Sequence, residues 1–143
     1  MARCASGRLH SLFLDCFGTV WSLGNNYFGQ LGLGHNTMIP SPQKINNLPP
    51  IISVSAGSYF SLFVATNGCV WSCGYNGHGR LGLGDENNRN VPEQITNLPK
   101  IKSAIALGQS SIFLESVNSD LANHNQLFRL TSVFPVVLRK GCR

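Results

Sequence analysis

The sequence predicts an all-β protein built from repeated antiparallel units, and three observations support this prediction. Residues 16–53 align with residues 66–103 without a gap and share 18 identities in 38 positions. A repeat period of about 20 to 50 residues is typical of solenoids, propellers and repeat arrays. The chain has 15 glycines and only 12% charged residues, which suits short strands joined by tight turns. The glycines also recur inside the repeat too densely for a helix.

Each unit contains a predicted hairpin. In the second copy, the apolar runs Ser61–Ala65 and Cys69–Cys73 flank Asn67-Gly68. Asn-Gly is a strong hairpin signal because a type I′ turn requires positive φ at both central positions. The first copy predicts the same hairpin over Ser11–Leu14 and Val20–Leu23, with Gly18 in the turn.

A glycine-rich loop follows the second strand of each hairpin, and we expect it to be compact, with close backbone approach. The leucines within it, Leu31, Leu33, Leu81 and Leu83, are expected to fill the core beneath the loop. The tryptophan before it is expected to pack in the core rather than stack on a ligand. The repeated structural positions are Gly18, Trp21, Gly24, Gly29, Gly32 and Gly34, and then Gly68, Trp71, Gly74, Gly79, Gly82 and Gly84.

The remainder of the unit predicts two further strands. A polar stretch containing Pro42 leads to a short run that ends at Ile45, and Asn47-Leu48-Pro49 forms a turn. Ile51–Ala56 is the inner-strand candidate, and the second copy repeats this order as far as Ile101–Ala106. Four short strands per unit are the content of one propeller blade. The predicted fold is therefore a partial β-propeller of four-stranded antiparallel blades, with about two blades plus partial strands.

Repeat boundaries suggest four segments. Residues 1–15 form the end of a first, partial repeat, 16–65 and 66–115 are repeat units, and 116–143 is a non-repeat tail. The second unit includes the start of a third, in which one residue is inserted and Ser111 aligns with His10 and Phe60. In the tail, we expect a short helix over Ser119–Leu130 and an extended segment over Ser132–Leu138. The abrupt start after Met1 favours a truncated piece of a longer propeller.

The repeated motifs resemble a known family. Gly7-x-x-His10-Ser11-Leu12-x-Leu14, a turn glycine, Val-Trp-Ser-x-Gly and Gly-Gln-Leu-Gly-Leu-Gly occur in order over roughly residues 5–115, which resembles the regulator of chromosome condensation family. The resemblance implies a β-propeller, typically seven-bladed. It also implies either guanine-nucleotide exchange on a nuclear Ras-like GTPase, as in the founding member, or a protein-interaction platform. Kelch and WD repeats fit less well, because the chain has no Gly-Gly pair and Ser follows both repeated tryptophans.

No constellation of catalytic residues is predicted. Gly77-x-Gly79-x-x-Gly82 matches a dinucleotide fingerprint in letters, but no helix is expected after it. His10 suits a packing site or a local hydrogen bond, and Asp85-Glu86 suit a solvated turn rather than an acid/base pair. We therefore expect no catalytic, cofactor-binding or metal-binding residues and no cofactor.

The charge distribution and the cysteine content limit the classes of partner and the cellular compartments that are expected. The net charge of +5 lies mostly in the tail, whereas residues 16–115 carry five basic and four acidic side chains, which argues against a nucleic-acid groove. Five cysteines without Cys-x-x-Cys favour a reducing compartment, the cytoplasm or the nucleus. No apolar run is long enough to span a membrane.

These inferences favour a non-catalytic protein-interaction module with a protein partner. The alternative is a guanine-nucleotide exchange regulator of a small Ras-like GTPase, although the gap-free spacing leaves no room for the wedge-like insertion on which exchange depends in the family. A third interpretation is a truncated product with little activity of its own. Open blade edges and faces are also expected to promote self-association.

Overall fold

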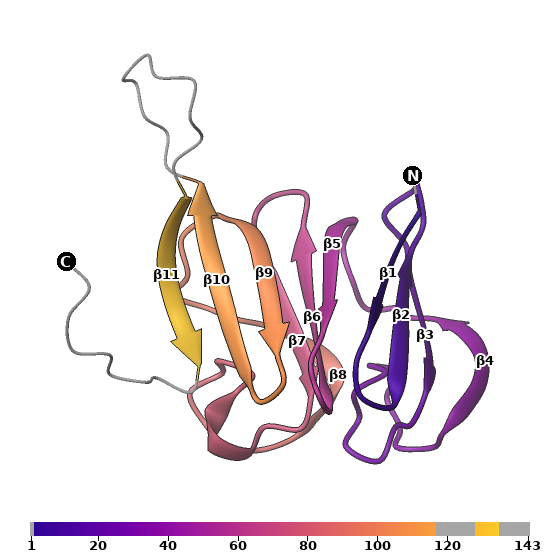
Figure 1. Cartoon of the computed structure of the whole chain (residues 1–143). Helices are drawn as coiled ribbons and strands as arrows, with labels where there is room; N and C mark the ends of the chain where they lie inside the picture. Colours follow the sequence, from indigo (N-terminus) through magenta and orange to yellow (C-terminus); the bar gives the residue numbers. More distant parts are fainter. Residues whose placement is uncertain (1, 117–127, 135–143) are drawn as a thin grey trace.

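The computed structural model describes residues 2–116 and 128–134, and these residues contain eleven strands and no α-helix. The strands form three antiparallel sheets that lie one after another in chain order (Figure 1). This arrangement of blade-like sheets confirms the predicted all-β, partial-propeller fold. No helix among the described residues is long and apolar enough to cross a membrane.

The three sheets are successive stretches of the chain. The first sheet has the order β1-β2-β3-β4 and consists of Arg3–Ser6, His10–Leu14, Val20–Gly24 and Ile39–Lys44. The second has the order β5-β6-β7-β8 and consists of Ile51–Ala56, Phe60–Ala65, Val70–Gly74 and Arg89–Gln94. The third has the order β11-β10-β9 and consists of β9 Ile101–Leu107, β10 Ser110–Ser116 and β11 Phe128–Phe134.

Burial along the strands follows the position of each sheet. All six residues of β6 are buried, because the second sheet lies between the other two and is covered on both faces. In β2, burial alternates, since the described residues cover only one face of the first sheet. The outer strands β4 and β8 contain Pro42 and Pro92, residues that an edge strand tolerates because they cannot donate a ladder hydrogen bond.

Two apolar clusters hold the sheets together. The cluster between the first and second sheets includes Leu12, Leu14 and Val20 from one side and Phe63 and Ala65 from the other. The cluster between the second and third sheets is built mainly from Phe60, Leu62, Val64, Val70, Ala104 and Phe113. Leu31 and Leu81 are fully buried and Leu33 and Leu83 partly buried, as predicted for the leucines of the loops.

The hairpin turns differ from the prediction. Gly68 has φ 83°, but Asn67 is not among the residues with positive φ, so the turn is not type I′. The Gly68 N–H donates to Ala65 O (3.0 Å) and the Ala65 N–H donates to Cys69 O (2.9 Å). This is a type I turn followed by a left-handed glycine, the three-residue hairpin loop. Asn67 instead accepts a bond from the Cys69 N–H through its side-chain oxygen (3.0 Å).

Two other predictions are wrong in part. Trp71 packs partly buried against the first cluster, but Trp21 is 36% exposed because no described residue covers its face of the first sheet. The tail helix expected over Ser119–Leu130 is wrong at 128–130, which belong to β11 and pair with β10. Residues 119–127 and 135–138 of the two tail predictions lie outside the described residues.

Candidate interaction surface

The glycine-rich loops that follow β3 and β7 are each held by one buried asparagine. The Asn26 amide donates to His35 O (2.8 Å) and Thr37 O (3.1 Å), and its oxygen accepts from the Leu31 N–H (3.0 Å). The asparagine therefore satisfies backbone groups that a loop without regular structure would otherwise leave unpaired.

Asn76 repeats this role in the second loop. Its oxygen accepts from the Leu81 N–H (3.0 Å), and its amide donates to the backbone and side-chain oxygens of Asp85 (3.0 Å each). Neither asparagine is among the residues predicted from the sequence, although asparagine occupies the same position in both units, 50 residues apart.

Asp85 lies in an exposed turn with its side chain 36% exposed, and its hydrogen bonds also help to hold the loop. The Arg89 guanidinium donates to its carboxylate (2.7 Å), and the Asn87 N–H donates to the same group (2.9 Å). The hydrogen bond from Arg89 is the main cause that lowers the pKa of Asp85 to about 2. Glu86 is exposed and accepts from the His78 N–H.

The repeated glycines all adopt the left-handed backbone region. Positive φ is found at Gly18, Gly24, Gly29, Gly32, Gly34, Gly68, Gly74, Gly79, Gly82 and Gly84. Two of these glycines, at the ends of β3 and β7, leave no room for a side chain: a Cβ at Gly24 would lie 2.6 Å from Leu9 O, and one at Gly74 would lie 2.4 Å from Tyr59 O. These contacts draw the loops against the β1–β2 and β5–β6 turns, and so bring the side chains of both together.

The close packing of the loops against these turns brings several aromatic rings into contact. The ring of Phe28 lies 5.0 Å from that of Tyr27, 5.2 Å from Tyr59 and 4.7 Å from Tyr75 between centroids. Edge-to-face and tilted pairs at such distances are favourable because the ring quadrupoles are complementary. The Arg8 guanidinium lies over the Tyr59 ring, 5.8 Å from its centroid.

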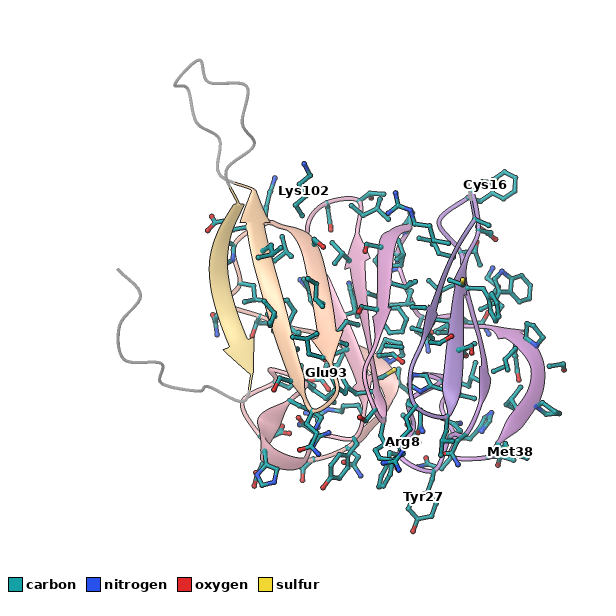
Figure 2. The ribbon with its side chains drawn as sticks, viewed as in Figure 1. Arg8, Cys16, Tyr27, Met38, Glu93 and Lys102 are labelled. Carbon is teal, nitrogen blue, oxygen red and sulfur yellow. The ribbon has the colours of Figure 1, made fainter. Side chains whose placement is uncertain are left out.

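We call Arg8, Leu9, Tyr27, Phe28, Tyr59 and Tyr75 the loop surface. Tyr27 is 73% exposed and Leu9 54% exposed. Figure 2 shows Arg8 and Tyr27 at one end of the sheets, with Cys16 and Lys102 at the opposite end. Arg8 makes no ion pair with a carboxylate in the described part of the chain. Exposed aromatic and arginine side chains of this kind are the residues that are enriched at protein interfaces.

The two units differ in a pair of residues that touch each other at this surface. In the first unit, the Gln30 amide donates to Asn25 Oδ1 (2.9 Å). The equivalent residues of the second unit are Tyr75 and Arg80, and the Arg80 guanidinium lies over the Tyr75 ring at 4.5 Å. Burial lowers the pKa of Arg80, and its Nε donates to Gly77 O (3.1 Å).

The structure brings His10 and Ser61 together across the first interface between sheets. His10 Nε2 lies 3.0 Å from Ser61 Oγ, which in turn donates to Gln30 O (2.7 Å). Burial lowers the pKa of His10 to about 4. Both side chains are buried and the serine proton is directed to a backbone carbonyl, so the pair joins two sheets and does not form an exposed nucleophile.

Ser111 is equivalent to Ser61, and its predicted alignment with His10 is wrong. The Ser111 hydroxyl donates to Arg80 O (2.8 Å), just as Ser61 donates to Gln30 O. Ala106 pairs with Ser111 as Ala56 pairs with Ser61, so the 50-residue spacing continues without an insertion.

Other candidate chemistry has structural explanations. Gly77–Gly79 forms a single 3-10 turn, and the strand β8 comes next rather than an α-helix, so the fingerprint lacks its helix. Burial raises the pKa of the Cys73 thiol, which keeps it protonated. No group of three or more metal-binding side chains occurs among residues 2–116 and 128–134.

Two shallow depressions lie at the hairpin turns, where Cys16 is found in Figure 2. One has a volume of about 170 Å³ beside Gly18 and Pro49, and the other has about 260 Å³ beside Gly68 and Pro99. They occupy equivalent positions in the two units, so the repeat architecture itself accounts for them.

Family models agree with the repeats seen in the structure. The model described as the regulator of chromosome condensation (RCC1) repeat matches residues 18–64 and 67–114, and a second model of this repeat matches 51–80. The protein RCC2 homolog of Xenopus laevis is 46% identical over 56 residues, which cover 38% of this chain and 11% of that protein. Human protein RCC2 is 45% identical over 56 residues, with the same coverage.

Solved structures show the same fold. Prp20p of Saccharomyces cerevisiae, described together with its binding properties to Gsp1p and histones, has a TM-score of 0.73 and 31% identity. Human WBSCR16 has a TM-score of 0.72 and 30% identity. Each match covers 79% of this chain and 30% of the other, so the chain spans about a third of these relatives. Because the repeat model matches most of its length and its sheets superpose on these structures, the chain belongs to the regulator of chromosome condensation (RCC1) repeat family.

Proposed function

We propose that this protein is a non-catalytic, intracellular interaction module, acting in the cytoplasm or nucleus, that binds a protein partner through the loop surface. The observation that carries the proposal is the exposure of Tyr27 and Leu9 beside a packed row of aromatic rings. Phe28 fixes the neighbouring rings in place, so little side-chain freedom remains to be lost when a partner binds.

The family relationship supports a protein partner. Prp20p, which shares 31% identity and the fold over 79% of this chain, is described as binding Gsp1p and histones. The repeat core of the present chain carries almost balanced charge, which favours a folded protein surface over the phosphate backbone of a nucleic acid.

A binding titration tests this proposal. The panel consists of purified histones and Ras-like GTPases in both nucleotide states, and affinity is measured by calorimetry. Tyr27→Ala is expected to weaken binding by tenfold or more, because an exposed tyrosine on a rigid surface is a typical hot spot. Phe17→Ala is the matched control, since Phe17 is 84% exposed but lies in the hairpin turn at the other end of the sheets.

Two results contradict the proposal. One is a partner whose affinity is unchanged by Tyr27→Ala and by Arg8→Ala. The other is the absence of binding to every protein of the panel by a chain that is folded by circular dichroism.

Guanine-nucleotide exchange on a small Ras-like GTPase is the second candidate, and the similarity to Prp20p is the observation that favours it. The loops after β3 and β7 are of equal length and neither carries an inserted segment, so no wedge is present in this part of the chain. Release of fluorescent GDP from the GTPase panel separates the two candidates. Stimulation well above the spontaneous rate would replace the interaction module as the leading function.

A further inference from the structure

The chain contains the dipeptide Asn-Gly twice, at Asn67-Gly68 and at Asn76-Gly77. In this dipeptide the backbone nitrogen of the glycine can attack the side-chain amide carbon of the asparagine, because glycine has no Cβ to hinder the approach. Ammonia leaves, a cyclic succinimide forms, and water then opens the ring to aspartate or isoaspartate. The reacting groups are the same in both dipeptides, so the structure decides whether each one reacts in the folded protein.

Asn67 is exposed in the hairpin turn that joins β6 to β7 (Figure 1). Its side-chain oxygen accepts from the Cys69 N–H (3.0 Å), and its amide nitrogen has no hydrogen-bond partner among the described residues. The Cys69 N–H is placed to stabilise the negative charge that develops on the side-chain oxygen during attack. The amide of Asn67 is therefore open to water and polarised, and no hydrogen bond holds its leaving group.

Attack on Asn67 requires only a local opening of the turn. The Gly68 N–H, whose proton must be removed before the nitrogen attacks, donates to Ala65 O (3.0 Å). This bond lies in an exposed turn, where local opening costs much less than global unfolding. The strands beside the turn can stay paired, since Val64 pairs with Val70 and both side chains are buried.

Asn76 is fully buried, and each of its polar groups is hydrogen-bonded. Its amide donates to the backbone and side-chain oxygens of Asp85 (3.0 Å each), and its side-chain oxygen accepts from the Leu81 N–H (3.0 Å). Its own N–H donates to Asn88 Oδ1 (2.9 Å), and its carbonyl accepts from the Gly79 N–H (3.0 Å). Ammonia can leave this residue only if the whole loop opens.

The structure also tolerates the two products differently. An aspartate at position 67 keeps the oxygen that accepts from the Cys69 N–H, and its charge strengthens this bond. The new carboxylate lies in the depression of about 260 Å³ that Lys100 also lines. An aspartate at position 76 lacks the amide hydrogens that bond to Asp85, and it places a second carboxylate against that residue.

We propose that Asn67 is a site of spontaneous deamidation in the folded protein and that Asn76 is not. The reaction consumes a water molecule, releases ammonia and converts a neutral amide into a carboxylate. In the isoaspartate product the backbone runs through the former side chain and is one carbon longer, which disturbs the pairing of Ala65 with Cys69 across the turn. This turn lies at the end of the sheets opposite the loop surface, so the proposal is independent of the proposed function.

Peptide mapping by mass spectrometry of the full chain, incubated at neutral and mildly alkaline pH, tests the proposal. Conversion of Asn67 is expected to be at least about tenfold faster than conversion of Asn76, because exposed turns open far more often than buried loops. In concentrated urea the two rates should converge, since the folded structure no longer separates them. Equal rates in the folded protein overturn the proposal, and so does a difference that persists unchanged in urea.

Three variants test the assignment to Asn67 and the effect of the products. Asn67→Gln lengthens the side chain by one methylene and makes ring closure unfavourable, so the corresponding peptide should no longer gain mass. Asn67→Asp should melt like the wild type, whereas Asn76→Asp should melt at a lower temperature or fail to fold. Unchanged conversion in Asn67→Gln, or equal melting of the two aspartate variants, contradicts the proposal.

Discussion

The Arg80 guanidinium lies over the Tyr75 ring, 4.5 Å from its centroid, where the first unit joins Gln30 to Asn25 by a hydrogen bond of 2.9 Å. Both residues of this contacting pair therefore differ between the first and the second repeat. Each pair links the start of its loop to the residue whose backbone carbonyl accepts the serine of the following sheet.

The two pairs should be interchangeable as pairs but not as single residues. Arg80→Gln and Tyr75→Asn are each expected to destabilise the protein by about 1 kcal/mol, because each leaves a cation or an aromatic face without its partner. The double variant should recover a substantial part of that loss. Urea unfolding of the four proteins measures the coupling, and strictly additive effects would contradict it.

The free energy of unfolding should decrease as the pH is lowered, because His10 becomes protonated. Burial lowers the pKa of His10 from its ordinary value of 6.5 to about 4 in the folded protein. The unfolded chain therefore binds more protons between these values, and stability present above pH 6.5 is lost progressively as the pH falls to 4. The loss is on the order of 3 kcal/mol by linkage.

His10→Phe provides the control for this pH dependence. Phe60 occupies the equivalent position at the second interface, and its ring lies against Gly57 as the His10 ring lies against Gly7. The variant should fold and lose the stability change between pH 6.5 and 4 that is measured by urea titration at each pH. A variant that keeps the full wild-type slope would show that another group is responsible.

Loss of the loop asparagine should be costly. Asn76→Ala leaves the Leu81 N–H and the Asp85 carbonyl without their partner inside the protein, which costs about 1–3 kcal/mol for each buried group that water cannot reach. Thermal and urea unfolding measure the effect. Asn46→Ala is the control, because Asn46 is exposed and its replacement should change stability by less than about 0.5 kcal/mol.

Two phenylalanines at the same repeat position should differ in their contribution to stability. Phe63 is fully buried between the first and second sheets, so Phe63→Ala should cost about 3–5 kcal/mol. Phe13 is 37% exposed, and Phe13→Ala should cost clearly less. Equal losses at the two positions would mean that the outer face of the first sheet is covered in solution.

The local sequence was sufficient to predict the strands and the all-β fold. Alternating apolar residues, the turn glycines and the 50-residue period each reflect short-range requirements of the backbone. They can therefore be recognised without knowledge of the tertiary structure. The same patterns led to the type I′ turn that the structure replaces by a type I turn with Gly68. A glycine signals where φ must be positive, but it does not say whether its neighbour shares that requirement.

Relationships between sheets were decided only by the tertiary structure. Trp21 and Trp71 are identical in sequence context, yet one is exposed and the other half-buried, because burial depends on whether another sheet lies alongside. His10 meets Ser61, and Phe28 meets Tyr59 and Tyr75, across separations of more than 30 residues. The sequence by itself determined the repeated unit. The packing of one unit on the next determined which of its identical positions became core, interface or exposed surface, since burial is a property of neighbours and not of a residue.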